Sequence, residues 1–268
     1  MKDIKWYRAW DIVYPVGIYY VLMNVATFVV CLIVPLTDES YGFIKVLTTL
    51  FVLPVVYVMY RNDQLRRGVQ KAKAKELLFD MRSEIVPLLG ILVMAACAAV
   101  VLNNLIAWTP LMKVSATYQS VTRKFFGGAV IFEILGPCIL VPVLEEYVFR
   151  GLVYKRLREW LGMTWAVVIS AIIFGMMHMN IVQFVYAGFL GVFLALCVER
   201  TKHLYGAILA HMAANTISVI RTETNWLSWM DESLQAQALT TVGMGLVFIG
   251  LYLLVFWKGK AVSYTHLR

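Results

Sequence analysis

The sequence predicts an all-α, polytopic membrane protein, and three observations lead to this fold class. Of 268 residues, 61% are hydrophobic and 15% are charged, whereas a soluble domain has about a quarter charged residues. The mean hydropathy is +0.74. Apolar runs of about 20 residues, the length that crosses about 30 Å of hydrocarbon, recur along the chain. Backbone groups in lipid must be satisfied within each segment, so these runs are expected to be helices despite their Gly and Pro residues.

We expect about eight transmembrane helices in one integrated membrane domain. Residues 1–120 would hold the first three helices, and 121–268 would hold the bundle that carries the chemistry. The first apolar run is too long for a cleavable signal peptide. The candidate spans are 10–35, 42–60, 85–108, 126–149, 163–180, 181–199, 204–220 and 237–257.

The distribution of basic residues predicts that both termini are cytoplasmic. With that orientation, 19 of the 24 Lys and Arg residues fall on the inner side, as the positive-inside rule requires. The basic loop 61–84 is expected to form an amphipathic helix at the cytoplasmic surface, and a charge cluster that sets topology is a simpler explanation than specific lipid binding. The tail 261–268 carries no readable signal.

The net charge of +8 does not indicate nucleic-acid binding, because the basic residues lie in short segments between apolar runs. The partners we expect are the lipid bilayer and a membrane-associated peptide or protein, and no nucleic acid. The four cysteines lie in apolar runs without a CxxC pair, so they are expected to pack as small hydrophobes. They are Cys31, Cys97, Cys138 and Cys197.

Ionisable residues inside apolar spans are costly, and each is a candidate functional residue. In "VPVLEEYVFRG", Glu146 and Arg150 are four residues apart, so they share a helix face and can form an ion pair. Glu145 is rotated by about 100° from Glu146 and is left to point into the bundle. Pro142, one turn earlier, removes a backbone donor and is expected to kink the helix near Glu145.

Two further spans carry polar groups at the same spacing of four residues. In "FGMMH", Phe174 and His178 share a face, and Gly175 permits close approach of a neighbouring helix. In "HMAAN", His211 and Asn215 share a face that is otherwise lined by alanines. Each histidine or amide alone is more often a packing or hydrogen-bonding group. Together, a carboxylate, two imidazoles and an amide on apolar helices can activate water and stabilise an oxyanion.

These three motifs, in this order, resemble the EExxxR, FxxxH and HxxxN motifs of the CPBP family. That family contains the type II CAAX prenyl endopeptidases and the bacterial Abi proteins, which process bacteriocins or give immunity to them. The resemblance covers residues 125–220. It implies an intramembrane endopeptidase that cleaves near the membrane surface, in a prokaryotic cytoplasmic membrane.

The resemblance also implies roles for individual residues. Glu145 would be the general base that activates water, assisted by His178, and His211 with Asn215 would stabilise the oxyanion. Glu146 and Arg150 would hold the geometry of the site, and Phe174 would line it. Two histidines and a glutamate can also bind zinc. The family has been described both as metalloproteases and as metal-free glutamate-dependent hydrolases. We favour a site without a tightly bound metal; a zinc ion, if present, would use Glu145, His178 and His211.

The expected depths of these residues conflict if the helices are straight. Glu145 lies five residues from the cytoplasmic Arg150, whereas His178 lies about 22 Å along the fifth span. We therefore predict that the fourth helix continues through 151–158, which places Glu145 deeper. A shared site requires Glu145 within about 10 Å of at least one histidine.

Two other functions fit the same residues. A non-catalytic scaffold or bacteriocin-immunity protein would use the polar set as interhelical hydrogen bonds. A proton-coupled transporter could use buried Glu and His as a relay, but the sequence shows neither an inverted repeat nor paired broken helices. An unchanged phenotype on substitution of Glu145 by Gln would favour the scaffold, and proton or solute flux in liposomes that vanishes with this substitution would favour the transporter.

Overall fold

The computed structural model confirms the all-α fold. It describes residues 6–66 and 74–257, with side chains omitted for 74–84, and the described residues contain no strand. Every predicted apolar segment is helical over most of its length. The long helices are α1 (Trp6–Cys31), α2 (Tyr41–Arg66), α3 (Ala74–Ala107), α9 (Met163–Met176), α10 (Ile181–Thr201), α11 (Leu204–Glu223) and α12 (Leu234–Tyr252).

The predicted fourth span is a continuous helix, Val130–Leu161, in which α-helical and π-helical stretches alternate. The expected continuation through 151–158 is therefore confirmed. Its stretches are α6 (Val130–Glu133), η1 (Ile134–Leu140), α7 (Val141–Glu146), η2 (Tyr147–Tyr154) and α8 (Lys155–Leu161); η1 and η2 are π-helical. The remaining short elements are α4 (Leu111–Val114), α5 (Ala116–Phe125), the 3₁₀ helix η3 (Asn225–Met230) and the π-helical η4 (Leu253–Trp257).

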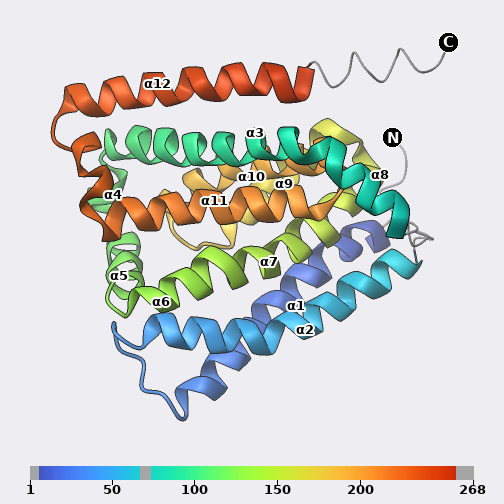
Figure 1. Ribbon diagram of the computed structural model, residues 1–268. Helices are drawn as coiled ribbons and strands as arrows, with labels where there is room; N and C mark the ends of the chain where they lie inside the picture. The colour runs from blue at the N-terminus through green and yellow to red at the C-terminus, as the bar shows by residue number, and fades with distance from the viewer. Residues whose placement is uncertain (1–5, 67–73, 258–268) are drawn as a thin grey trace.

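The long helices run side by side, with Val130–Leu161 between two groups (Figure 1). On one side, α1 and α2 pack against each other and against its π-helical stretches. On the other, α11 packs against it, and α3 lies between α11 and α12. At one end of the bundle, α5 meets Val130–Leu161 at 114°. The helices before residue 120 thus pack directly on those after it.

The number of spans differs from the expected eight. Five helices are long and apolar enough to cross a membrane, and a sixth span results if α5 and Val130–Leu161 count as one bent span. Two predicted spans fail this test. The helix α9 ends at Met176 and has only 14 residues, which rise about 21 Å. In α11, the polar residues His211 and Asn215 interrupt the apolar run.

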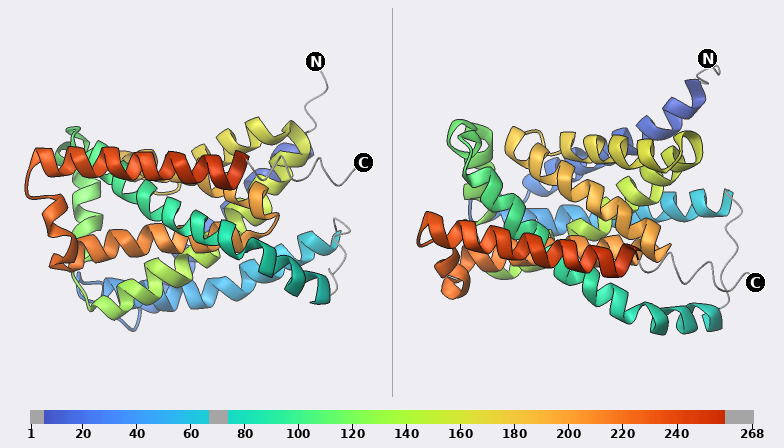
Figure 2. Two further views of the ribbon diagram at one scale, coloured as in Figure 1. Left: turned by 45° about the horizontal axis from the view of Figure 1, so that its top comes forward. Right: turned by 90° about the horizontal axis from the view of Figure 1, so that it is seen from above.

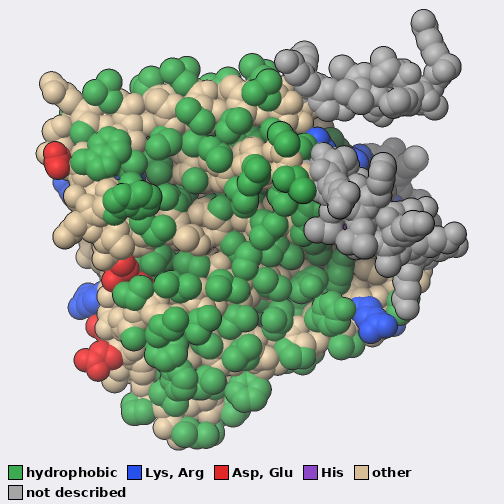
Figure 3. Space-filling model, viewed as in Figure 1, with side chains coloured by type: hydrophobic (Ala, Val, Ile, Leu, Met, Phe, Trp, Pro, Cys, Tyr) green, Lys and Arg blue, Asp and Glu red, His purple; other side chains and the backbone are tan. Residues whose placement is uncertain are grey.

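The surface of the bundle fits a membrane environment. Large apolar side chains on the outer helices are widely exposed, among them Val86 on α3 and Leu239 on α12. In the space-filling view, charged side chains lie at the two ends of the helices, and the face between them is largely hydrophobic (Figure 3). Such a face is unfavourable in water and favourable in lipid. The protein is therefore an integral, multi-pass membrane protein.

The first residues of α1 and the last residues of η4 lie at the same end of the bundle (Figures 1 and 2). This agrees with termini on one side of the membrane, and the cytoplasmic assignment stays a prediction. Part of the predicted amphipathic segment, 67–73, and the tail 261–268 lie outside the described residues. Residues 61–66 extend α2, and 74–84 begin α3.

Candidate active site

The ion pair expected from the "EEYVFRG" spacing is present and fully buried. Nη1 of Arg150 lies 2.9 Å from Oε1 of Glu146, and both side chains are 0% exposed. Nη2 of Arg150 donates to the backbone carbonyl of Gly191 on α10 at 3.1 Å. The guanidinium also lies 4.4 Å from the ring centre of Phe174. Burying two charges is costly unless other groups satisfy them; the carbonyl and the aromatic face do so in part, while Nε of Arg150 and Oε2 of Glu146 have no hydrogen-bond partner.

The imidazole of His211 bridges the two glutamates, a relationship that helical rotation alone did not predict. Its Nδ1 lies 3.0 Å from Oε1 of Glu146, and its Nε2 lies 3.9 Å from Oε2 of Glu145. A carboxylate accepts hydrogen bonds, so Nδ1 carries the proton and Nε2 faces Glu145. Glu145 thus lies within the roughly 10 Å of a histidine that a shared site requires.

Glu145 differs from Glu146 in its surroundings. Its side chain is 13% exposed, whereas that of Glu146 is 0% exposed. Its Oε1 accepts a 3.4 Å hydrogen bond from the hydroxyl of Tyr19 on α1. Arg150 holds Glu146 in place, and the less buried Glu145 has one oxygen facing Tyr19 and the other facing His211. This matches the expected division between a structural and a free carboxylate.

His178 lies in the turn after α9, not on a helix as predicted. The helix ends at Met176, and the side chain of Asn180 caps α10 by accepting from the backbone N–H of Gln183. This cap ends the helical run before His178. The imidazole keeps the expected contact with Phe174, at 5.2 Å between ring centres, and its Nδ1 lies 3.1 Å from that residue's backbone carbonyl. A carbonyl only accepts, so Nδ1 carries the proton and the Nε2 lone pair is available.

Phe174 joins the two histidines. Its ring is 1% exposed and lies edge-on to His211, with 5.7 Å between ring centres, as well as to His178. The expected close approach at Gly175 is confirmed, because a Cβ there would lie 2.7 Å from the backbone oxygen of Phe184 on α10.

Asn215 contacts the backbone of the site helix. Its Nδ2 donates to the carbonyl of Pro137 at 2.8 Å. In η1 the N–H of Val141 bonds to the carbonyl of Gly136, five residues earlier. The next donor in that ladder would be the N–H of residue 142, which is a proline and has none. The amide of Asn215 therefore satisfies a carbonyl that Pro142 leaves without its π-helical partner.

At Pro142, where a kink was predicted, the helix is continuous and is widened into a π-helical stretch just before it. This stretch, η1, comes directly before α7, which carries both glutamates, and η2 follows directly after α7. Such π-helical turns inside α-helices often occur at functional sites.

The three residues named as zinc ligands for the alternative with a metal are Glu145, His178 and His211. Among the described residues, no cluster of three His, Cys, Asp or Glu side chains has the geometry to hold a metal ion. The Nδ1 atoms of His178 and His211 face a carbonyl and a carboxylate.

Sequence reasoning missed three residues that contact the site. Tyr19 and Phe149 are aromatic residues in apolar runs, and Gly191 is one of two glycines in α10. A Cβ at Gly191 would lie 3.1 Å from Nη2 of Arg150. Only the packing of α1 and α10 against the site helix distinguishes these residues from ordinary core residues.

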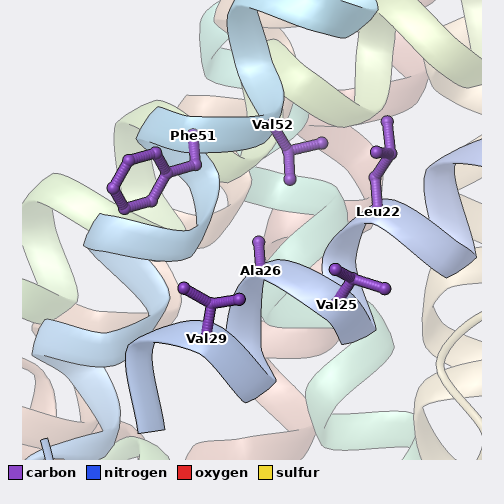
Figure 4. Close-up of a pocket in the computed structure, with 6 residues that line it drawn as sticks. All are labelled: Leu22, Val25, Ala26, Val29, Phe51 and Val52. Carbon is purple, nitrogen blue, oxygen red and sulfur yellow. The ribbon is translucent and has the colours of Figure 1, made fainter. Parts of the chain in front are cut away.

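An apolar groove opens between α1 and α2, beside the site (Figure 4). Its volume is about 240 Å³. One of its lining residues, Leu22, lies one turn after Tyr19 on α1. The lining residues are Leu22, Val25, Ala26, Val29, Phe51 and Val52.

Comparison with known proteins agrees with this geometry. A family model described as type II CAAX prenyl endopeptidase Rce1-like matches residues 127–217, which contain all three motifs. The resemblance to the CPBP family is confirmed over this segment. Residues 127–217 are therefore called the CPBP segment. A protein of Bacillus subtilis (strain 168) named "Putative membrane peptidase YdiL" is 34% identical to this chain over 92 residues.

That alignment covers 34% of this chain and 38% of the relative, so the similarity is confined to about a third of each protein. No solved structure matches the chain. The CPBP segment holds Glu145, Arg150, His178 and His211, whereas α1, α2 and α12 lie outside it.

Proposed function

We propose that this protein is an intramembrane endopeptidase that hydrolyses a peptide bond near the membrane surface. One observation carries the proposal: Oε2 of Glu145 and Nε2 of His211 lie 3.9 Å apart inside the CPBP segment. At that separation, the two atoms flank one small space, in which Glu145 can accept from the attacking water and His211 can face the oxyanion that forms. A general base and an oxyanion donor on either side of one space are the parts that amide hydrolysis needs.

In the proposed mechanism, Glu145 takes a proton from the water as its oxygen attacks the carbonyl carbon of the substrate. The available Nε2 of His178 orients the water by accepting its other proton in a hydrogen bond. The carbonyl oxygen becomes an oxyanion. When the C–N bond breaks, the proton held by Glu145 passes to the leaving nitrogen, which gives a carboxylic acid and an amine.

The oxyanion requires hydrogen-bond donors that stabilise its negative charge. His211 can supply one when its Nε2 is protonated, since Glu146 accepts from Nδ1 at 3.0 Å and supports the positive charge. Asn215 uses one N–H for the Pro137 carbonyl and retains a second. We propose that these two donors stabilise the oxyanion, and that Arg150 holds Glu146 in position. The proposed mechanism uses only side chains of the protein and a water molecule.

We propose a membrane-associated peptide or protein as the substrate. The matched family model names prenyl endopeptidases, so a peptide ending in S-farnesyl-cysteine and three further residues is the first probe. An unmodified membrane-spanning peptide is the second. Comparing the two in detergent separates lipid-modified from unmodified substrates.

Glu145→Gln tests the proposal with the purified full-length protein. A general base contributes about 10²- to 10⁴-fold to rate, so cleavage of the probe is expected to fall by at least about a hundredfold. Glu133→Gln is the matched control, because Glu133 is a second buried glutamate on the same helix, 1% exposed. It is expected to retain activity.

Absence of cleavage by the wild-type protein with both probes, or equal activity of the two variants, would contradict the proposal. A cellular phenotype that persists in a well-folded Glu145→Gln protein would instead favour a scaffold or immunity protein. Solute or proton flux into liposomes that depends on Glu145 would indicate transport.

A further inference from the structure

The helix α1 reaches the candidate active site although it lies outside the CPBP segment. The hydroxyl of Tyr19 is 3.4 Å from Oε1 of Glu145, the oxygen that does not face His211. Tyr19 is 8% exposed, so its hydroxyl does not simply project into solvent or lipid. Building on the proposed function, we infer that Tyr19 is a positioning residue that fixes the orientation of the Glu145 carboxylate.

Aromatic packing holds the Tyr19 ring in place. Its ring lies edge-on to Phe149, with 5.8 Å between centres, and Phe149 lies 5.0 Å from Phe174. Phe174 in turn contacts His178 and His211. Edge-to-face pairs at these distances are favourable beyond simple burial. A continuous set of rings therefore links Tyr19 to both histidines and limits where its hydroxyl can lie.

Arg156 fastens α1 to the helix that carries Glu145. Pro15 lacks an N–H, which leaves the carbonyl of Asp11 without its usual helical donor, and Nη1 of Arg156 donates to that carbonyl. Nη2 of Arg156 also donates to the hydroxyl of Tyr14 at 2.7 Å.

The same guanidinium pairs with Asp63 on α2 at 2.7 Å. The side chains of Arg156 and Asp63 are 13% and 10% exposed, so this pair is largely shielded from solvent. Arg156 lies on the same continuous helix as Glu145. It therefore connects α1 and α2 to that helix about three turns from the glutamate.

The two oxygens of the Glu145 carboxylate therefore have different partners. Without Tyr19, the carboxylate of a flexible glutamate can rotate away from His211, because no other described residue forms a hydrogen bond with Oε1. With Tyr19, Oε1 is held and Oε2 is left for water and His211. The N-terminal helix pair is thus a part of the active site and not only a membrane anchor.

Tyr19→Phe tests this inference, because it removes the hydroxyl and keeps the ring. With the farnesylated probe, kcat is expected to fall about tenfold, as loss of a hydrogen bond to a charged group predicts. KM is expected to stay unchanged, since Tyr19 acts through Glu145. Tyr20→Phe is the control: Tyr20 is the next residue on α1 but is 47% exposed, and it is expected to keep full activity.

A second measurement does not depend on activity. Thermal unfolding midpoints in detergent are compared for Tyr19→Phe in the wild-type background and in Glu145→Ala. If the hydroxyl bonds to Glu145, the shift caused by Tyr19→Phe is expected to shrink when Glu145 is absent.

Additive midpoint shifts, or a kcat for Tyr19→Phe equal to that of Tyr20→Phe, would overturn the inference. If the wild-type protein cleaves neither probe, the proposed function fails on its own, and the unfolding comparison still decides whether Tyr19 holds Glu145.

Discussion

Nδ1 of His211 lies 3.0 Å from Oε1 of Glu146, and both side chains are almost completely buried. Glu146 therefore joins Arg150 to His211, with a guanidinium and an imidazole on the same carboxylate oxygen. A histidine held in this way has a fixed tautomer and a fixed ring orientation. The other ring nitrogen of His211, Nε2, faces the second glutamate, Glu145.

Arg150→Met is expected to destabilise the protein strongly. It leaves Glu146 as a buried charge without its arginine, and breaking such pairs costs about 3–5 kcal/mol. The double variant Glu146→Gln, Arg150→Met is expected to be more stable than Arg150→Met alone, because no unpaired charge remains. Chemical unfolding in detergent measures both. A single variant as stable as the wild type would contradict the importance of the pair.

Gly191→Ala is expected to lower stability and activity together. The new Cβ would lie 3.1 Å from Nη2 of Arg150 and 3.2 Å from Cα of Ala171, so the guanidinium or a helix must move. Overpacking of this kind costs about 1–3 kcal/mol.

Gly188→Ala provides the control for Gly191→Ala on the same helix, because no atom lies within 4 Å of its added Cβ. We expect Gly188→Ala to be neutral or slightly stabilising, since alanine favours helix over glycine. Equal unfolding midpoints for the two variants would show that the space around Arg150 is not restrictive.

Asn215→Ala is expected to destabilise the site helix by about 1–2 kcal/mol, because the buried carbonyl of Pro137 loses its donor. Pro142→Ala restores a backbone N–H at the position that the π-helical ladder lacks. The effect of Asn215→Ala should therefore be smaller in the Pro142→Ala background. Unfolding midpoints of the four proteins test this, and additive effects would rule out the pairing.

Treatment with a chelator is expected to leave peptide cleavage unchanged, because the side chains at the site do not form a three-ligand metal group. The measurement is the cleavage rate of the probe before and after incubation with EDTA or 1,10-phenanthroline, followed by gel filtration. Loss of activity that returns on addition of zinc would show that Glu145 and the histidines rearrange around a metal ion.

The site was partly predictable from local spacing. The separation of four residues in each motif placed Glu146 with Arg150 and Phe174 with His178, because side chains at that spacing share a helix face. The continuation of the fourth helix through 151–158 was predicted from the expected depths of Glu145 and His178 in the membrane. The end of α9 before His178 was not predicted, because the cap of the following helix decides it.

The sequence alone determined that this is a helical membrane protein and that Glu146, Arg150 and His211 lie within its helices. Those properties follow from composition and from helical periodicity, which are local. The tertiary structure decided that His211 bridges both glutamates, that Asn215 satisfies the carbonyl left by Pro142, and that Tyr19 contacts Glu145. Each of these contacts joins residues at least 65 positions apart, so only the packing of separate helices could bring them together.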